Sequence, residues 1–600
     1  MTIATPHPED PPYLNVSGSV LGRRWLGPTP DVERRGLGLA QRCGLPELLG
    51  RLLAARGVSV EEAPLWLEPT LKHYMPDPSS LRDMEAASAR LAEAALRGER
   101  VALFGDYDVD GACSTALMSR WLAHFGVSAT VYIPDRLREG YGPNVPAMTR
   151  LGATHDLVIT LDCGTLAFEP IAAAREAGAE VMIVDHHLAL ETLPDCVAVV
   201  NPNRQDDDSE QGHLCAAGVA FLLLAATNRR LRAQGAFASR PEPNLLEELD
   251  LVALATVADV AQLRGVNRAF VRQGLKVLGR RGNLGLAALS DASRLSGAPS
   301  AYHLGYLLGP RVNAGGRVGD SGAGARLMTC ADPALAAKLA ADLDRWNRER
   351  QAIEADVLSQ AMAQAEARWE REGPGGLVWA AGEGWHPGVI GVVAGRLKEK
   401  FDRPSLVVAL EGALGKGSAR SVHGVDLGSA VHAAAEKGLL VQGGGHAMAA
   451  GLTVAAERLA EATSWMEAEL SRQGANRLGP RELRIDGAVT PSGATLELCE
   501  SLERAGPFGA GAPSPRLAVT AARVSWPKPV GETHMRCVLT DSRGGRLEAV
   551  AFRAQETALG GFMAARSDGA LVHAVGRLSA DEWNGRRRVQ LQIEDMAPLA

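Results

Sequence analysis

Three aspartates stand within five consecutive positions of the segment GDYDVDG, directly after a short apolar run that has the character of a buried strand. They are Asp106, Asp108 and Asp110. Like charges at this spacing repel one another, and a carboxylate beside an apolar core needs compensation. We therefore expect a positive charge beside these three residues, although taken alone they could also be a helix cap with additional acidic residues.

Further acidic and imidazole side chains follow other apolar runs in the same part of the chain. Asp162 ends VITLD, the triplet Asp185, His186 and His187 ends MIVDHH, and Asp259 lies in VALATVADVAQL. In an open parallel sheet, ligands bind beyond the carboxyl ends of the strands. A single aspartate there is more often a helix N-cap than a ligand. Several after successive strands would crowd one crevice with like charges, so the set favours a metal site.

The mixture of ligand types indicates which metal and which reaction. Oxygen ligands together with imidazole suit Mn²⁺ or Mg²⁺ better than a structural zinc. The number of candidates exceeds what one ion needs, and two ions roughly 3.5–4 Å apart are the natural solution. Such a pair activates water and neutralises phosphate oxygens. The residues therefore predict hydrolysis of a phosphoester or phosphoanhydride.

The elements that must position these side chains follow from the pattern of apolar runs. From residue 99, short apolar runs alternate with alanine-rich segments, which is typical of a parallel, doubly wound sheet. Residues 332–371 contain no glycine and predict one helix of roughly 60 Å, with two ordinary helices as the alternative. A second α/β unit begins at about 373, and five or so β-segments after about 481 predict a small closed barrel such as an OB-fold.

Composition and charge narrow the class of protein further. The 600 residues are 46% hydrophobic and 22% charged, which suggests an ordinary globular chain of several domains. A net charge of -7 gives no overall basic signal, so any nucleic-acid binding must come from local patches. The eight cysteines form no CxxC pair and indicate reduced thiols. Without a signal-like leader or a membrane-length apolar run, we expect a cytoplasmic protein.

The motifs taken together resemble a known superfamily. DYDVDG, LDCG, VDHH and TVADV resemble the successive motifs of the DHH phosphoesterases. LGPRVNAGGRVGD, GWHPGVIGVVAGRL, GKGSARSVHGVDL and GGGHAMAAGLTV resemble the RecJ branch, the single-strand-specific 5′→3′ DNA exonucleases. The resemblance implies an α/β fold in which a parallel-sheet DHH domain is joined by a long helix to a second α/β (DHHA1) domain, with a C-terminal OB-like β-barrel. The expected parts are an N-terminal helical region at 1–98, the DHH catalytic domain at 99–330, the connecting helix at 331–372, the DHHA1 substrate-binding domain at 373–476 and the OB-fold nucleic-acid-binding domain at 477–600.

The resemblance also implies roles for particular residues. The expected reaction is metal-dependent 5′→3′ hydrolysis of single-stranded DNA in repair and recombination, with two Mn²⁺ or Mg²⁺ ions. Catalytic roles fall to Asp110, Asp185 and His187, and Asp185 is either a ligand or a group that orients a histidine. The implied metal ligands are Asp106, Asp108, Asp110, Asp162, His186, His187 and Asp259.

Basic and glycine-rich segments offer candidates for holding the DNA. We expect GPRVNAGGR to be a loop that presents arginine forks to phosphate. GKGSARS and GGGHAMAAG offer anion-binding donors, and the barrel offers tryptophans beside cations. Ordinary solvated surface is the alternative in each case. The substrate-binding candidates are Arg311, Asn313, Arg317, Ser418, Arg420, Ser421 and His446, and the barrel candidates are Trp526, Lys528 and Arg586.

Two other functions remain open on the sequence alone. A small-substrate DHH hydrolase would act on oligonucleotides, a cyclic dinucleotide or pyrophosphate, but such proteins are typically shorter and lack a terminal barrel. A non-catalytic DNA-binding relative would have lost acids from the motifs, whereas the acids named above are all present. The family further suggests a helicase and a single-strand-binding protein as partners, and we expect a monomer with no membrane association.

Overall fold

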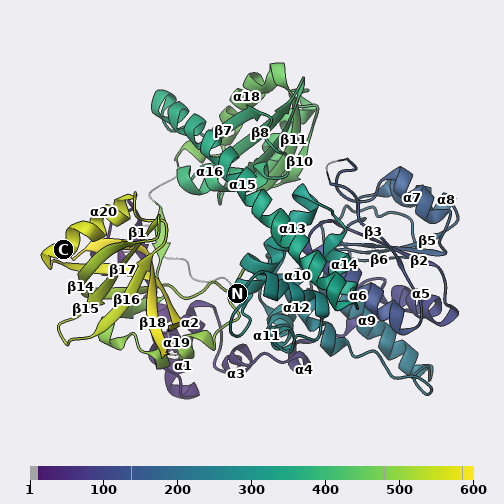
Figure 1. The fold of residues 1–600 in the computed structure, drawn as a ribbon, viewed down its shortest axis with the longest axis horizontal. Helices are drawn as coiled ribbons and strands as arrows, with labels where there is room; N and C mark the ends of the chain where they lie inside the picture. Colours follow the sequence, from purple (N-terminus) through teal and green to yellow (C-terminus); the bar gives the residue numbers. More distant parts are fainter. Residues whose placement is uncertain (1–10, 137, 478–480, 584–585, 600) are drawn as a thin grey trace. The chain divides into compact units, whose positions relative to one another are not determined.

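A computed structural model describes residues 11–136, 138–477, 481–583 and 586–599, which form two sheets flanked by helices and a β-barrel (Figure 1). The described residues divide into two compact units. The barrel unit contains the N-terminal part as far as Pro76, Val260–Gln273 and the C-terminal part from residue 481. The two-sheet unit contains Asp77–Asp259 and the chain from Gly274 to residue 477. All the candidate metal ligands lie in the two-sheet unit.

The first sheet is entirely parallel, with the strand order β3-β2-β4-β5-β6. Its central strands β2 and β4 are buried along their whole length, which explains why they are continuous apolar runs rather than alternating ones. This confirms the parallel sheet expected from the alternating pattern. The strands are β2 (Val101–Gly105), β3 (Thr130–Tyr132), β4 (Leu157–Leu161), β5 (Glu180–Val184) and β6 (Ala198–Val200).

Helices follow these strands and cover the sheet (Figure 1). Helix α6 begins shortly after β2 and packs against α9, α10 and α14, so its first ten residues are buried. The helices of this part are α5 (Met84–Arg97), α6 (Val109–His124), α7 (Val145–Gly152), α8 (Phe168–Glu176), α9 (Ala216–Ala233), α10 (Leu249–Ala258), α12 (Leu284–Ala292) and α14 (Ala323–Thr329).

The segment GPRVNAGGR is helical, so the expected loop is wrong. A π-helical stretch, His303–Leu308, runs directly into α13 (Gly309–Val318). The glycines serve close packing rather than a loop, because a Cβ at Gly316 would lie 2.8 Å from the carbonyl oxygen of Tyr107. Helix α13 can therefore approach the acidic turn after β2.

A single uninterrupted helix, α15 (Pro333–Glu372), extends over 40 residues, as the composition of this segment predicts. Asp332 caps its start by accepting a hydrogen bond from the Ala334 amide. The helix packs on α12, α13 and α14 near its start and on β7 and α16 further along. It thereby connects the two sheets of this unit.

The second sheet is mixed, with the order β10-β11-β9-β8-β7, and only the β7–β8 pair is parallel. GKGSAR and GGGH, the segments expected to offer anion-binding donors, lie in strands β9 and β10. In β9 a Cβ at Gly417 would lie 2.6 Å from Leu452, so this glycine makes room for a core side chain. The elements are β7 (Val378–Glu383), β8 (Ser405–Glu411), β9 (Leu414–Arg420), β10 (Gln442–His446), β11 (Ala449–Ala455), α16 (Ile390–Phe401), α17 (Leu427–Glu436) and α18 (Leu459–Arg472).

In the barrel unit, five strands close because β14 pairs with both β15 and β17, which confirms the expected barrel. Helices α1 (Pro30–Cys43) and α2 (Glu47–Ala55) form a separate hydrophobic cluster with Leu502, Ala505 and Leu517, and β1 (Arg24–Leu26) pairs with β12 (Glu482–Arg484). The expected N-terminal region is therefore divided, since α5 belongs to the two-sheet unit. The barrel strands are β14 (Leu517–Val530), β15 (His534–Thr540), β16 (Arg546–Ala551), β17 (Leu571–Trp583) and β18 (Arg586–Pro598).

Among the helices of these described residues, none has the length and apolar character needed to cross a membrane.

Candidate metal centre and anion site

Four strands of the first sheet end at the same level. In the strand register Gly105 pairs with Leu161, Leu161 with Val184 and Val184 with Val200. The next residue of each strand continues this ladder, because the amides of Asp106, Asp162 and Asp185 donate to the carbonyls of Leu161, Val184 and Val200. Polar side chains that are far apart in the sequence are thereby held along one edge of the sheet.

The turn from β2 into α6 carries three carboxylates, and backbone amides bind two of them, Asp108 and Asp110. Asp108 is the N-cap of α6 and accepts from the amides of Asp110 and Gly111, at 2.9 and 3.0 Å. Asp110 is buried, and its two oxygens accept from Ala216 and Ala217 at the N-terminus of α9, at 2.6 and 2.8 Å. The positive end of that helix dipole stabilises the buried charge.

Asp162 and Asp259 complete the carboxylate set. Asp162 is buried at the end of β4 and has a φ of +64°, a conformation that aspartate tolerates better than most residues. Asp259 follows the last residue of α10. His186 lies between them, since its Nε2 is 3.2 Å from Oδ1 of Asp162 and its Nδ1 is 3.9 Å from Oδ2 of Asp259.

Asp185 is occupied by protein donors and orients His187. Its Oδ1 accepts from the amides of His186 and His187 and from Nδ1 of His187, the last at 2.8 Å. Its Oδ2 accepts from the Thr165 amide. Of the two roles expected for Asp185, this arrangement favours the one that positions a histidine.

Two residues after β6 support this segment, and sequence reasoning did not single them out. The side-chain amide of Asn201 donates to the carbonyl oxygen of His187, at 2.8 Å, and to Thr165. Asn203 donates to the carbonyl oxygen of His186. The signal was the polar run NPN directly after an apolar strand, which marks a fourth strand end at the same edge.

The side chains form three overlapping groups whose potential ligand atoms lie within 4.8 Å of one another. Within these groups, Oδ1 of Asp106 and Oδ1 of Asp162 are buried and accept no hydrogen bond from the part of the chain that the structure describes. Carboxylate oxygens without a hydrogen-bond donor, close to imidazole nitrogens, are suitable ligands for a divalent cation that binds oxygen and nitrogen. The groups are Asp106, Asp108 and Asp162; Asp110, His186 and Asp259; and Asp162, His186 and His187.

Without a cation, the electrostatics of this cluster are unfavourable. Burial and the charge of Asp108 raise the pKa of Asp106 to about 8, and burial and the charge of Asp110 raise that of Asp259 to about 8. Burial, followed by neighbouring carboxylates, also raises the pKa of Asp162 well above its usual value. A bound cation removes the cause of these shifts, because it stabilises the ionised carboxylates.

Four arginines influence one another at α13: Arg317 on the helix itself, Arg420 on β9, Arg350 on α15 and Arg136 in the loop after β3. Nη1 of Arg317 donates to the carbonyl oxygen of Gly388, at 2.8 Å, which ties α13 to the segment before α16. Burial, followed by the charges of Arg136 and Arg350, lowers the pKa of Arg317 to about 10. Burial and the charge of Arg136 also lower the pKa of Arg420. Arg136, which sequence reasoning missed, packs over the Tyr107 ring at 4.9 Å. Cations held this close fit a bound anion.

Three of the expected substrate-binding residues have structural partners instead. Arg311 pairs with Asp344, at 3.0 Å, and donates to the carbonyl oxygen of Leu307. Oδ1 of Asn313 accepts from the Val109 amide and so braces the acidic turn. Ser421 is buried and donates to the carbonyl oxygen of Val425.

The remaining candidates of the two-sheet unit are better placed for a ligand. Oγ of Ser418 accepts from Arg420, at 3.2 Å, on the same strand. A Cβ at Gly391 would lie 2.9 Å from Nη2 of Arg420, so this glycine lets the arginine reach the start of α16. His446 is exposed at the end of β10, and its Nδ1 accepts from the Met448 amide.

In the barrel, Trp526 is 62% exposed and Arg546 packs over its ring at 4.7 Å. Lys528 is exposed on the same strand. The side chain of Arg586 lies outside the described residues. The barrel therefore presents one aromatic ring beside cations, which is compatible with the stacking role expected for it.

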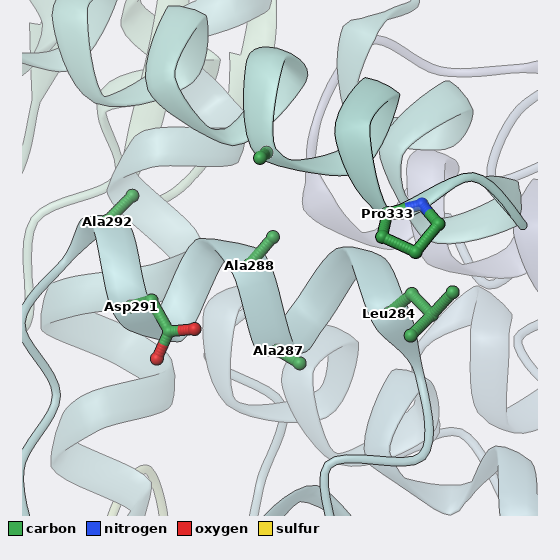
Figure 2. A pocket seen from close by; sticks show the side chains of 7 residues that line it. Leu284, Ala287, Ala288, Asp291, Ala292 and Pro333 are labelled. Atoms are coloured by element: carbon green, nitrogen blue, oxygen red, sulfur yellow. The ribbon is translucent and has the colours of Figure 1, made fainter.

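A hollow between α12 and the start of α15 lies elsewhere in the two-sheet unit (Figure 2). Alanines dominate its lining, and the only ionisable residue among those that line it is Asp291, which pairs with Arg281. This lining offers no catalytic chemistry. The reactive groups are concentrated at the edge of the first sheet.

The fold and this acidic centre define a protein of the DHH class with a barrel appended. Family models match accordingly: the DHH family N-terminal domain at residues 100–256, the DHHA1 domain at 374–472 and the RecJ OB domain at 485–595. The chain belongs to the RecJ family of single-stranded-DNA-specific exonucleases.

Relatives of this family match over nearly the whole chain. The single-stranded-DNA-specific exonuclease RecJ of Dickeya dadantii is 36% identical over 576 residues, which cover 92% of this chain and 96% of the relative. The Escherichia coli protein is 36% identical over 578 residues with the same coverage. The crystal structure of RecJ in complex with Mn²⁺ from Thermus thermophilus is 28% identical, covers 96% of this chain and 79% of that chain, and has a TM-score of 0.79.

Raised carboxyl pKa values predict how stability depends on pH and metal. The folded state keeps protons on Asp106 and Asp259 that the unfolded chain has already released, so stability falls as the pH rises through about 8. We expect the unfolding temperature of the metal-free protein to fall between roughly pH 6 and pH 8.5. Mn²⁺ at 100 times its dissociation constant should add about 2.7 kcal/mol and, for a unit of this size, raise the unfolding temperature by roughly 2–3 °C at the upper end of that range.

Differential scanning fluorimetry with chelator and with Mn²⁺ measures both effects. Asp162→Asn should unfold at or above the wild-type temperature in chelator and lose the Mn²⁺ response, because one repelling ligand is gone. Asp291→Asn, an exposed carboxylate on α12, is the matched control and should respond as the wild type does. A full Mn²⁺ response in Asp162→Asn would contradict the metal assignment.

Proposed function

We propose that this protein is a metal-dependent exonuclease that hydrolyses single-stranded DNA from the 5′ end, in DNA repair and recombination. The observation that carries the proposal is the combination at one site of a buried carboxylate–imidazole cluster and an arginine group. The cluster suits phosphodiester hydrolysis, and the arginines suit a DNA phosphate.

The residues that would hold the metal are those of the three overlapping groups. Two Mn²⁺ or Mg²⁺ ions would be held by Asp106, Asp108, Asp110, Asp162, His186, His187 and Asp259. When bound, such ions supply Lewis acidity at the scissile phosphate and lower the pKa of a water molecule. Asp185 binds Nδ1 of His187, and the Tyr141 hydroxyl lies 3.3 Å from Nε2, so a metal ion at Nε2 would take the place of that hydroxyl contact.

The arginine group gives the 5′ end a place to bind. Arg317 and Arg420 approach each other from the two α/β parts of one compact unit, with Arg136 contributing from the loop after β3. Burial makes the guanidinium groups of Arg317 and Arg420 favour an anion strongly, because little water competes for their donors. A terminal phosphate held there would leave the first phosphodiester to extend toward the carboxylates, which is the basis for 5′ polarity.

The small-substrate hydrolase is less well supported as an alternative. A dinucleotide or pyrophosphate enzyme has no evident use for a closed barrel with an exposed tryptophan beside cations. A non-catalytic relative is also disfavoured, because the full carboxylate and histidine set is present. We further propose action as a monomer in the cytoplasm, with a helicase and a single-strand-binding protein supplying the substrate.

The catalytic assignment is tested on 5′-labelled and 3′-labelled single strands. With Mn²⁺, we expect 5′ mononucleotide release from single strands far faster than from blunt duplex, and no cleavage with chelator. Asp110→Ala and His187→Ala should lower the rate by on the order of 100-fold or more, because metal-holding groups are lost, while single-strand binding persists. Asp291→Ala is the control. Unchanged cleavage by either variant would refute the catalytic assignment, and equal rates on duplex would refute strand selectivity.

The phosphate-binding assignment has a separate readout. Arg420→Ala should raise KM about tenfold for a 5′-phosphorylated strand, the loss expected for a hydrogen bond to a charged group, and should leave the 5′-hydroxyl strand nearly unaffected. Arg396→Ala, which removes an exposed arginine of α16 paired with Glu399, serves as the control. Equal effects on both strands would show that Arg420 does not contact the terminal phosphate.

A further inference from the structure

Two tyrosines form an exposed stacked pair in the two-sheet unit. Tyr302 and Tyr306 are one helical turn apart, and their ring centroids are 4.9 Å apart at an interplanar angle of 25°. They are 62% and 71% exposed, which is more than the 53% of Tyr141. Solvent-exposed aromatic rings that already stack on each other leave an outer π-face free for a third ring.

The helix that carries the pair is fixed against the metal-ligand segments. Its opposite face is buried through Leu304 and Leu308. A Cβ at Gly305 would lie 3.2 Å from Val257, two residues before Asp259, so the backbone here packs closely on the end of α10. A Cβ at Gly309, in the next turn, would similarly meet the side chains of α10 and α6. The helix that carries the tyrosine pair therefore packs directly on the segments that lead to Asp259 and Asp110.

The helix that carries the two tyrosines continues into α13. The π-helical stretch His303–Leu308 continues into α13, which carries Arg317 at its far end. A π-turn inside a longer helix changes the direction in which side chains project and is frequent at functional sites. One continuous helix thus presents two aromatic rings at one end and an arginine of the anion site at the other.

We propose that Tyr302 and Tyr306 are a stacking platform for nucleobases of the single-stranded DNA whose 5′ end occupies the metal centre. The inference rests on the proposed function and extends it to how the strand behind the scissile phosphate is held. Every base has a π-face, so stacking grips a strand of any sequence. Duplex bases are already stacked and paired, so the platform binds unpaired strands in preference.

The platform is distinct from the metal and phosphate contacts in its chemistry. A stacked base contacts the uncharged faces of the two rings, so this contact does not depend on phosphate charge. Stacking on Tyr302 and Tyr306 therefore adds affinity that survives raised salt better than the arginine contacts do, because screening weakens phosphate contacts and leaves stacking largely intact.

The test compares binding of an intact strand with strands that lack single bases. A 5′-phosphorylated oligonucleotide and a series with one abasic site at successive positions from the 5′ end are titrated by fluorescence anisotropy with Ca²⁺ in place of Mn²⁺. In wild type, we expect one or two positions at which loss of the base weakens binding about tenfold. In Tyr302→Ala/Tyr306→Ala, binding of the intact strand weakens by the same factor and those positions no longer matter.

Matched variants separate stacking from folding. Tyr302→Phe/Tyr306→Phe keeps the rings and should retain the abasic effect, whereas Leu246→Ala, which truncates another exposed apolar residue, should leave it unchanged. The comparison of intact and abasic strands is made within one protein preparation, so a change in folded fraction does not imitate it.

The outcomes distinguish this inference from the proposed function. If the wild type cleaves single strands but the abasic pattern is the same in the double alanine variant, the platform assignment is wrong. If the wild type shows no base at which binding depends on stacking, it is also wrong. Failure of the wild type to cleave single strands with Mn²⁺ would instead overturn the proposed function.

Discussion

Repulsion among buried carboxylates at the aligned strand ends is the constraint on which the rest of this structure depends. Asp106, Asp162 and Asp185 each extend the backbone ladder of the first sheet by one residue, so the sheet itself forces their side chains together. Burial raises the pKa of Asp106 and Asp162, because neither has enough protein donors to satisfy its charge. The packing of the sheet and its helices holds the carboxylates in these positions despite their repulsion. A bound cation would offset the electrostatic free energy of that repulsion.

The surrounding elements each keep one part of that cluster in place. The N-terminus of α9 binds both oxygens of Asp110, and Asn313 of α13 holds the turn that contains Asp108. Asn201 and Asn203 donate hydrogen bonds to the backbone carbonyl oxygens of His187 and His186. The same helix α13 carries the arginine that reaches the segment before α16. Positions of metal-binding and anion-binding groups are therefore coupled through rigid helices rather than through loops, which keeps their spacing constant.

The features of the fold and of the site that could be predicted from the sequence were those with local signatures. Apolar runs ending in aspartate predicted the parallel sheet and its functional edge, because register places successive strand ends together. The prediction of a loop for GPRVNAGGR was wrong because glycine also permits close packing. Only a neighbour in space, here the Tyr107 carbonyl oxygen against Gly316, distinguishes the two roles. Arg136 carries no motif of its own, and the only signal for Asn203 is the run NPN after an apolar strand. The sequence also does not reveal that Arg311 forms an ion pair with Asp344, which lies on another helix.

The number and place of bound metal ions test the central claim most directly. Anomalous diffraction at the manganese edge, from crystals of this chain soaked in Mn²⁺, locates the ions without reference to activity. The account predicts two peaks roughly 3.5–4 Å apart among the carboxylates and histidines at the edge of the first sheet. No peak within that cluster, or ions bound only elsewhere on the molecule, would contradict it.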